Sequence, residues 1–586
     1  MELADVTTVR IHPAIGIARL GNSPDGYFLG PELPGSPPVP DDGRYKDAQG
    51  RVKRQAARFR CYGFNAASDE WIELTASAQV TVEWTVHLVN RKPAAKFARK
   101  EQLRNPSVTG TAREGLVINP GPRTLKAPGQ RAAFDTGKVR FGTTLTTVGL
   151  GEIRTETDGR LLVLGGPGTA RSPQNTPLKD YFDNDGWYDD TADGPVTATV
   201  SINGRAIAAK RAWVVVAPPK YAPELDHPVT LWDRLHALYY GTSRVPPRPS
   251  YTQDVYPILD RARRMWAVNK EANGWHGRWG EPVYGDAMRR KIFHWLRKPP
   301  GPGEKVDKTK MPKLAGDGSL TDAHLTVAQY ETMRRWWQGE FVRDWPGHPP
   351  ETPRMVTPGG LDRAVLEACV GATFTPGMEA GRYWLDKAVW AEPLRFATSV
   401  RPGEVTARMA LPWHADFYSC DNNWWPVARP NQVLSAEGTG YAEWIRGIAT
   451  LTQMVNNWHH LGFVRRESEQ RIVERERTEP PRLREHKVTA GTLAAGQHAS
   501  WPVWVTREDR RITVRIHTPD PAALAVEVET PLAVRITPQP ERTSDGLVFR
   551  IELPVELHTQ RQAHQGRWLV HLTATAPTRY RVDSQP

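Results

Sequence analysis

Residues 80–88, VTVEWTVHL, indicate the fold class of the first part of the chain, because apolar and polar side chains alternate along them. Alternation with a period of two is the pattern of a β-strand with one buried face. Two continuous apolar runs, 161–164 and 213–217, fit strands buried on both faces, and glycine and proline separate these segments. We therefore expect a large antiparallel β-rich region over residues 1–248. The glycine-rich segment 165–168 lacks both the spacing of a dinucleotide fingerprint and the lysine of a P-loop, so we interpret it as a loop and expect no nucleotide cofactor.

The apolar period changes to three or four residues farther along the chain, which predicts a mostly helical region over residues 249–465. One predicted helix runs from near Thr321 to Phe341. A second runs from about Tyr441 to Leu461, and its inward face is formed by Trp444, Ile448, Leu451, Val455 and Trp458. Gly462 follows as a C-terminal cap, so we expect Trp458 to point inward at the end of this helix.

The last part of the chain returns to a period of two. A charged interval over 466–487, which includes Pro480-Pro481, is interpreted as a linker or an exposed helix and loop. Beyond it, alternating runs at 512–516, 524–528, 532–536, 547–551 and 568–572 predict a β-sandwich over 488–586. The predicted fold class is therefore mixed α+β, with a β-rich N-terminal region, a helical region that carries the chemistry, and a C-terminal β-sandwich.

Composition narrows the class of protein. The formal charge is +12, from 77 basic and 65 acidic residues, and the basic residues are scattered rather than clustered, so we expect no nucleic-acid partner. Three cysteines, Cys61, Cys369 and Cys420, are too few for a disulfide framework or a thiolate metal site. The chain begins without a signal-peptide pattern and contains no apolar stretch long enough for a membrane helix. We expect a soluble protein made in the cytoplasm, with no membrane partner; non-classical export stays open.

One segment, residues 412–426 (PWHADFYSCDNNWWP), combines a carboxylate, an imidazole, a thiol and several indoles within fifteen residues. Residue types alone leave two interpretations open. The segment could place a reactive thiol beside a base, or it could be an aromatic-rich core loop.

Several segments in the same order along the chain resemble one family. They are IHPAIGIAR at 11–19, KRQAARFR at 53–60, LLVLGGPGTARSP at 161–173, NDGWYDD at 184–190, the MPKLAGD run from Met311, the run 361–381, the Cys420 segment and VNNWHHLGF at 455–463. The chain resembles the cysteine tryptophylquinone amino-acid oxidases, which include lysine ε-oxidase and glycine oxidase. The resemblance extends almost continuously from residue 10 to about 465, and residues beyond 485 do not share it.

The resemblance implies a cofactor made from the protein's own side chains. Cys420 would supply a thioether sulfur, and Trp458 would be the indole that is oxygenated to an ortho-quinone. Asp416 matches a carboxylate that in this family lies beside the quinone, where it would assist cofactor assembly and abstract a proton from the substrate. The implied reaction is oxidation of an amino acid or primary amine by O2, releasing ammonia and hydrogen peroxide. A separate flavin-dependent protein would complete the maturation.

Other residues have less defined roles. His414 and His459 flank the two cross-link partners and are candidates for positioning the substrate, whereas neither belongs to a metal-binding motif, so we expect no metal. Cys369 fits a buried structural cysteine or a position near the substrate channel. The C-terminal sandwich could mediate assembly of a homo-oligomer. The alternative to an active oxidase is an inactive family member that serves as a binding or scaffold protein.

Overall fold

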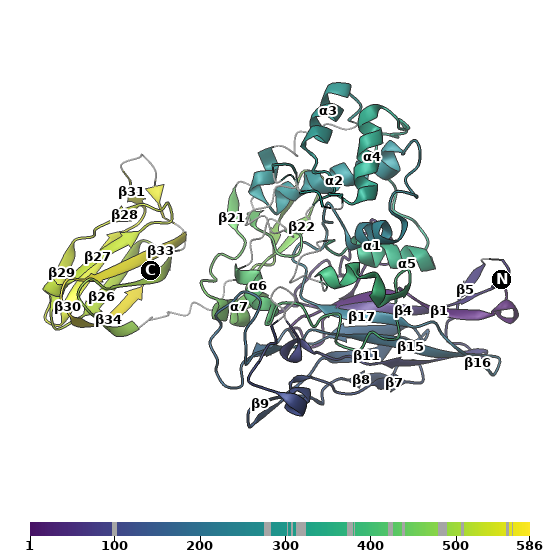
Figure 1. Ribbon diagram of the computed structural model, residues 1–586, viewed down its shortest axis with the longest axis horizontal. Helices are drawn as coiled ribbons and strands as arrows, with labels where there is room; N and C mark the ends of the chain where they lie inside the picture. Colours follow the sequence, from purple (N-terminus) through teal and green to yellow (C-terminus); the bar gives the residue numbers. More distant parts are fainter. Residues whose placement is uncertain are drawn as a thin grey trace. The chain divides into compact units, whose positions relative to one another are not determined.

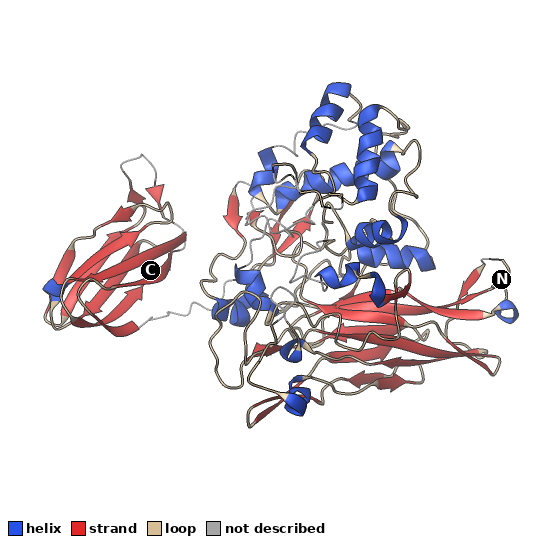
Figure 2. Cartoon of the chain, in the orientation of Figure 1, coloured by secondary structure: helices blue, strands red, loops and turns tan. Residues whose placement is uncertain are grey.

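The structure is a computed structural model of the whole chain (Figures 1 and 2). It describes all residues except 69, 97–101, 275–282, 302, 306, 308, 312–323, 372–378, 380, 420–425, 436–439, 479–488, 506–508, 558–561, 565 and 586. The chain divides into two compact units. The first comprises Met1–Trp444 and Met454–Arg477, and the second comprises Ile445–Gln453 and Thr478–Pro586. The four-part division predicted from the sequence stays a prediction.

A 13-stranded sheet forms the base of the first unit. Its main path runs in the order β7-β6-β15-β17-β2-β4-β12-β11-β8, and β1, β3, β5 and β16 pair at its sides. Most pairs are antiparallel, as predicted, whereas β17 pairs with β2 and β3 with β4 in parallel. The bounds of these strands are β1 Thr8–His12, β2 Ile15–Arg19, β3 Tyr27–Leu29, β4 Arg54–Phe64, β5 Trp71–Glu73, β6 Val80–Val86, β7 Arg123–Leu125, β8 Arg131–Ala133, β11 Gly151–Thr155, β12 Leu161–Gly165, β15 Ala192–Ile202, β16 Arg205–Ala208 and β17 Ala212–Ala217.

The sequence pattern explains which faces of this sheet are covered. Strand β6 has the predicted alternation, with Val80, Val82, Trp84 and Val86 buried. Strands β12 and β17 are buried along their whole length, which agrees with their continuous apolar runs. On one face, Ile17 and Val215 of the sheet join a core cluster with Leu235 of a helix, and Figure 1 shows helices α1 and α5 next to β17 and β4. Two hairpins, β9 (Gly137–Phe141) with β10 (Thr144–Val148) and β13 (Ala170–Arg171) with β14 (Tyr188–Asp189), connect strands of the sheet.

The helices follow in the middle of the chain. They are α1 Leu231–Tyr240, α2 Tyr256–Arg264, α3 Asp286–Trp295, α4 Val327–Gln338, α5 Pro358–Glu367, α6 Trp413–Ser419 and α7 Leu451–Asn457. Helix α4 is shorter than the helix predicted from Thr321 to Phe341. Thr326 caps its start through a capping box with Gln329, and Gly339 ends it in the left-handed conformation.

The long helix predicted from Tyr441 to Leu461 is wrong in its first half. Residues Tyr441–Glu443 form strand β21, which pairs with β20 (Gln432–Leu434). Gly447 then has a φ of 82°, which a right-handed helix does not accommodate. Helix α7 begins only at Leu451, and the 3-10 turn η10 (Trp458–His460) continues it. Trp458 is nevertheless buried at the end of this helix, as the pattern predicted.

Two further hairpins complete the first unit. They are β18 (Trp390–Glu392) with β19 (Arg395–Phe396), and β22 (Phe463–Arg466) with β23 (Ile472–Arg475). The second hairpin occupies the start of the predicted linker, because Ile472 and Val473 are buried there. Residues 479–487 of that interval lie outside the described residues.

The second unit contains a five-stranded and a four-stranded sheet around one apolar core, which confirms the predicted C-terminal sandwich. The predicted run 532–536 is strand only at Arg535–Ile536, because Leu532 is exposed and Ala533 has a positive φ. The strands are β24 Thr489–Leu493, β25 His498–Val505, β26 Arg511–His517, β27 Leu524–Glu529, β28 Arg535–Ile536, β29 Pro540–Thr543, β30 Gly546–Glu552, β33 Gly566–Ala574 and β34 Thr578–Gln585, with β31 Val555–Glu556 and β32 Gln562–Ala563 as a small separate pair.

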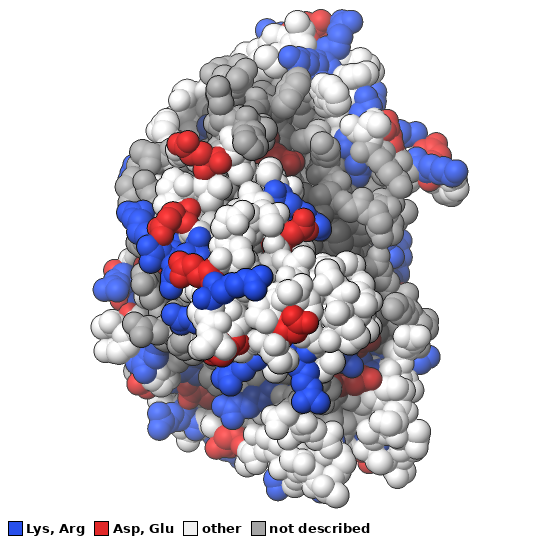
Figure 3. Space-filling view, turned by 90° about the vertical axis from the view of Figure 1, so that its left-hand side faces the viewer, with Lys and Arg blue, Asp and Glu red and all other residues white. Residues whose placement is uncertain are grey.

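Charged side chains of both signs are interspersed over the face shown in Figure 3, in agreement with their scatter along the sequence. Among the described residues, every helix is too short or too polar to cross a lipid bilayer.

Candidate active site

Trp458 lies at the centre of a buried aromatic cluster in the first unit. Its side chain is buried, and its ring meets the rings of Trp413 and His414 edge-on at 5.4 and 6.0 Å between centroids. The ring of His459 lies 5.9 Å from it on the side of η10. Tyr221 fixes the backbone at this point, because its hydroxyl group donates a 2.7 Å hydrogen bond to the Trp458 carbonyl oxygen. We call the group formed by Trp458, Trp413, His414 and Gly168 the Trp458 cluster.

The loop between β12 and β13 forms one wall of the cluster. Gly168 is buried there with a φ of +77°, a conformation that favours glycine. A Cβ atom at this position would lie 2.3 Å from Cζ2 and 2.9 Å from Cη2 of Trp458. The absence of a side chain at residue 168 therefore lets the backbone lie directly against the six-membered part of the indole.

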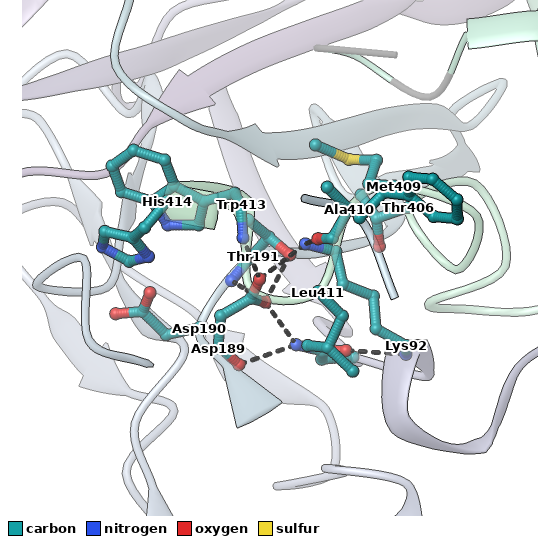
Figure 4. A network of polar contacts seen from close by, with 12 residues as sticks. Lys92, Asp189, Asp190, Thr191, Thr406, Met409, Ala410, Leu411, Trp413 and His414 are labelled. Carbon is teal, nitrogen blue, oxygen red and sulfur yellow. Dashed lines mark hydrogen bonds and ion pairs between the residues drawn. The ribbon is translucent and has the colours of Figure 1, made fainter. Parts of the chain in front are cut away.

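Helix α6 forms a second wall and is anchored by a buried ion pair (Figure 4). The Lys92 ammonium group contacts Asp189 Oδ2 at 2.7 Å, and both side chains are fully buried. Lys92 also donates to the Ala410 carbonyl oxygen at 2.8 Å, and Asp189 Oδ2 accepts the backbone N–H of Trp413 at 3.2 Å. These contacts hold the chain just before α6 and the first residue of the helix, so they fix the position of the Trp413 and His414 rings.

His414 is buried and stacks on Trp413 with 3.6 Å between ring centroids. Its Nε2 atom lies 3.1 Å from the Gly168 carbonyl oxygen. A carbonyl oxygen only accepts, so we assign the proton to Nε2 and a lone pair to Nδ1. Burial lowers the pKa of His414 well below its usual value. The imidazole is therefore neutral near pH 7 and offers Nδ1 as an acceptor.

Asp190 holds the Gly168 loop and lies near His414 in Figure 4. Its Oδ2 atom accepts the backbone N–H groups of Gly168 at 2.8 Å and Thr169 at 3.0 Å. Burial raises the pKa of Asp190 to about 8 and outweighs the hydrogen bonds from the Thr169 and Gly168 backbone N–H groups, which lower it, and the adjacent Asp189 acts in the same direction as burial.

Three buried polar atoms around the cluster have no hydrogen-bond partner among the described residues. They are Trp413 Nε1, His414 Nδ1 and Asp190 Oδ1. Buried polar atoms in folded proteins nearly always have partners, and an exception needs an explanation. One donor and one lone-pair acceptor therefore lie on residues whose rings face Trp458.

The structure brings some of the predicted site residues together. Asp416 is buried in the first turn of α6, three residues after Trp413, and residues three apart on a helix are neighbours on one face. His459 lies beside the Trp458 ring, and burial lowers its pKa to about 4. Cys420 directly follows α6 and lies outside the described residues, so its link to Trp458 stays a prediction.

Cys369 lies in a different environment. It belongs to a core cluster with Leu235 and Trp384, and its thiol donates to the Val365 carbonyl oxygen at 3.3 Å. Burial raises the pKa of this thiol. These contacts favour the structural interpretation of Cys369 over a place near the substrate.

Sequence reasoning missed the roles of Gly168, Asp190 and the Lys92–Asp189 pair. Gly168 was interpreted only as part of a loop, and the two aspartates were noted only within the NDGWYDD run. The positive φ and close contact of Gly168, and the partners of the aspartates, exist only in three dimensions. Within the described part of the chain, no three His, Cys, Asp or Glu side chains are grouped as metal ligands.

Comparison with known proteins adds to this geometry. Residues 12–216 match the family model described as L-lysine epsilon oxidase N-terminal, and residues 311–444 match the L-lysine epsilon oxidase C-terminal domain. The chain is 26% identical over 525 residues to the L-lysine 6-oxidase of Marinomonas mediterranea, which covers 70% of each protein.

Solved structures from the same organism share the fold. The structure of its epsilon-lysine oxidase aligns with a TM-score of 0.67 at 23% identity, covering 83% of this chain and 96% of that one. A crystal structure of that enzyme with L-Lys aligns with a TM-score of 0.65 at 23% identity, covering 80% and 95% of the two chains.

Proposed function

The chain belongs to the L-lysine ε-oxidase family and is an amino-acid oxidase, and from this premise we propose that it deaminates an amino acid or primary amine with O2 through a cysteine tryptophylquinone formed from Cys420 and Trp458. The products would be ammonia, hydrogen peroxide and an aldehyde or keto acid. The observation that supports this proposal most directly is the buried Trp458 ring, beside which Trp413 and His414 carry polar atoms that have no hydrogen-bond partner among the described residues.

The residues around Trp458 fit such a cofactor. An indole that becomes a quinone gains two oxygen atoms, which require polar neighbours and would be crowded by a side chain placed against the ring. Gly168 has no side chain where the six-membered ring meets the backbone. Trp413 Nε1 can donate a hydrogen bond to a quinone oxygen, whereas the lone pair of His414 Nδ1 suits a donor such as the substrate amine. The quinone would supply an acceptor for the electron pair that leaves the substrate carbon.

Side chains of this protein would abstract the proton, orient the substrate amine and exclude water. We assign proton abstraction from the substrate to Asp416, which is buried one helical turn from Trp413. His414 would orient the substrate amine, because its neutral imidazole presents the Nδ1 lone pair. The surrounding rings of Trp413, Phe417 and Tyr221 exclude water, which strengthens each of these polar interactions.

Maturation would require a partner. Trp458 is only 3% exposed, and oxygenating an indole is difficult chemistry. We propose that a separate flavin-dependent protein completes the modification, and that the chain made alone is a colourless precursor. A chain that becomes quinone-coloured and active without this partner would contradict the dependence.

Intact mass and peptide mapping test the cofactor. The mature chain should be heavier than its sequence by two oxygen atoms less the hydrogens lost, and the peptides that contain Cys420 and Trp458 should remain joined after digestion. Cys420→Ala and Trp458→Phe should lose the modification entirely. An unmodified mass after expression with the maturation protein would reject the oxidase proposal and favour the inactive scaffold.

A peroxide-coupled screen tests the substrate class. Because the matched relative is an L-lysine 6-oxidase, L-lysine should be assayed first, followed by glycine, other amino acids and simple primary amines. Peroxide and ammonia formed in equal amounts are the expected result. Peroxide formation without ammonia would exclude deamination.

A further inference from the structure

The carboxyl group of Asp190 holds the Gly168 loop through hydrogen bonds to its backbone. Its Oδ2 atom accepts two consecutive backbone N–H groups, from Gly168 at 2.8 Å and Thr169 at 3.0 Å. Gly166 also lies so close that a Cβ atom there would be 2.6 Å from the same oxygen. The loop is therefore folded around this one carboxyl group.

The Gly168 loop connects Asp190 to two members of the Trp458 cluster, Trp458 and His414. The Gly168 Cα atom lies against the six-membered ring of Trp458. The Gly168 carbonyl oxygen accepts the Nε2 proton of His414 at 3.1 Å. A single residue thus links Asp190 to the ring that would become the cofactor and to the imidazole proposed to orient the substrate.

The other oxygen, Oδ1, is buried and has no hydrogen-bond partner among the described residues. The titratable and charged groups near Asp190 are Tyr188 and Asp189 on β14, Arg171 opposite Tyr188 on β13, Lys92 on the turn η2 (Lys92–Ala94) and His414 on α6. The Lys92 ammonium group contacts Asp189 and the Ala410 carbonyl oxygen instead. A buried carboxyl group beside a second carboxylate, with no cation bonded to it, is more stable with its proton.

We propose that Asp190 is a positioning residue of the amine-oxidation site, that it holds a proton on Oδ1 near pH 7, and that in this form it keeps the Gly168 loop and His414 aligned against Trp458. The proposal rests on the proposed function only where it refers to turnover. The pKa of about 8 agrees with it. When the proton is lost, a buried negative charge to which no cation of the described residues is hydrogen-bonded appears next to the cluster, and the alignment is disturbed.

Two variants separate the carboxyl group's shape from its charge. Asp190→Asn keeps one oxygen to accept the Gly168 and Thr169 N–H groups and cannot ionise, whereas Asp190→Ala removes both contacts. Asp193→Asn is the matched control. Asp193 is also fully buried, but its two oxygens have partners, including Thr406 and Trp213, and its pKa is about 6.

Infrared spectroscopy and amide exchange on the purified full-length chain test the protonation and the loop without using turnover. The carboxylic-acid carbonyl band of the unsubstituted chain should contain a component that disappears near pH 8, is absent from Asp190→Asn and persists in Asp193→Asn. Hydrogen exchange at Gly168 and Thr169 should be slow in the unsubstituted chain and in Asp190→Asn, and fast in Asp190→Ala. An Asp190 that is already ionised at pH 6, or unchanged exchange in Asp190→Ala, would overturn the proposal.

Turnover by the mature chain supplies the second test. Asp190→Ala should lower kcat by about 10- to 100-fold, the scale expected for a displaced reacting geometry, and Asp190→Asn should recover most of this loss. The rate of the unsubstituted chain should fall above about pH 8, and this alkaline decline should be missing in Asp190→Asn but present in Asp193→Asn. The same alkaline decline in all three proteins would contradict the proposal. If no quinone forms, the proposed function fails, whereas the infrared and exchange results still decide the state of Asp190.

Discussion

Gly168→Ala tests whether the loop backbone supports the Trp458 ring. Two costs can be separated. First, alanine at a φ of +77° adopts the left-handed conformation, which costs about 1–2 kcal/mol for a residue with a Cβ atom. Second, the new methyl group would lie 2.3 Å from Trp458 Cζ2, and forcing extra volume into a packed core costs about 1–3 kcal/mol. The expected total is about 2–5 kcal/mol of folding free energy.

Gly129→Ala isolates the first cost. Gly129 has a φ of +75°, and nothing lies within 4 Å of a Cβ atom built there. Thermal unfolding of the two precursor variants should therefore show a clearly larger loss for Gly168→Ala, because only this variant displaces the ring. Intact mass after expression with the maturation protein should show a reduced cross-linked fraction for Gly168→Ala and a normal one for Gly129→Ala. Equal thermal losses together with full maturation of both variants would refute the assigned role of Gly168.

Three further predictions concern buried charge. Lys92→Met leaves the Asp189 carboxylate buried without its ammonium partner and should destabilise the chain by about 3–5 kcal/mol in thermal or denaturant unfolding; a loss below 1 kcal/mol would show that the pair does not anchor α6. Asp416→Asn should slow turnover of the matured fraction by about 10²- to 10⁴-fold, and near-normal turnover of a fully matured variant would exclude Asp416 as the base. Because folding raises the pKa of Asp190 from 3.8 to about 8, the folded chain binds a proton that the unfolded chain has released between these values, and stability should fall as the pH rises through this range. Asp190→Asn should flatten this slope in denaturant titrations at several pH values, and parallel slopes would contradict the shift.

The fold could be predicted wherever burial follows a regular period. The alternation at 80–88 predicted β6, and the continuous apolar runs predicted β12 and β17, because sheet faces covered on one or both sides select these patterns. The helix predicted over 441–461 failed for a physical reason. Trp444 and Ile448 have helical spacing, yet they are buried at the start and just after the end of the turn that follows β21, in which Gly447 has a positive φ.

The candidate site could be predicted only in part. Helical spacing predicted that Trp458 is buried, but residue types alone left the segment of His414 and Asp416 open to two interpretations, and the roles of Trp458 and Asp416 were implied by the family resemblance. Gly168 and Asp190 carry no such signal, since a glycine in a loop and an aspartate after a strand are common. Their roles depend on contacts between segments far apart in the sequence, which periodicity and spacing do not reveal.

The adjacent residues Asp189 and Asp190 tie the two walls of the Trp458 cluster to one point on the backbone. Asp189 contacts Lys92 and the first residue of α6, whereas Asp190 contacts the Gly168 loop. Successive side chains of an extended chain point to opposite sides. Asp189 and Asp190 therefore contact different walls because they are neighbours at the end of β14. Deleting one residue just before Asp189 would exchange the two directions and detach both walls together. This one-residue deletion should therefore impair assembly of the site more than substitution of any single aromatic residue around the Trp458 ring.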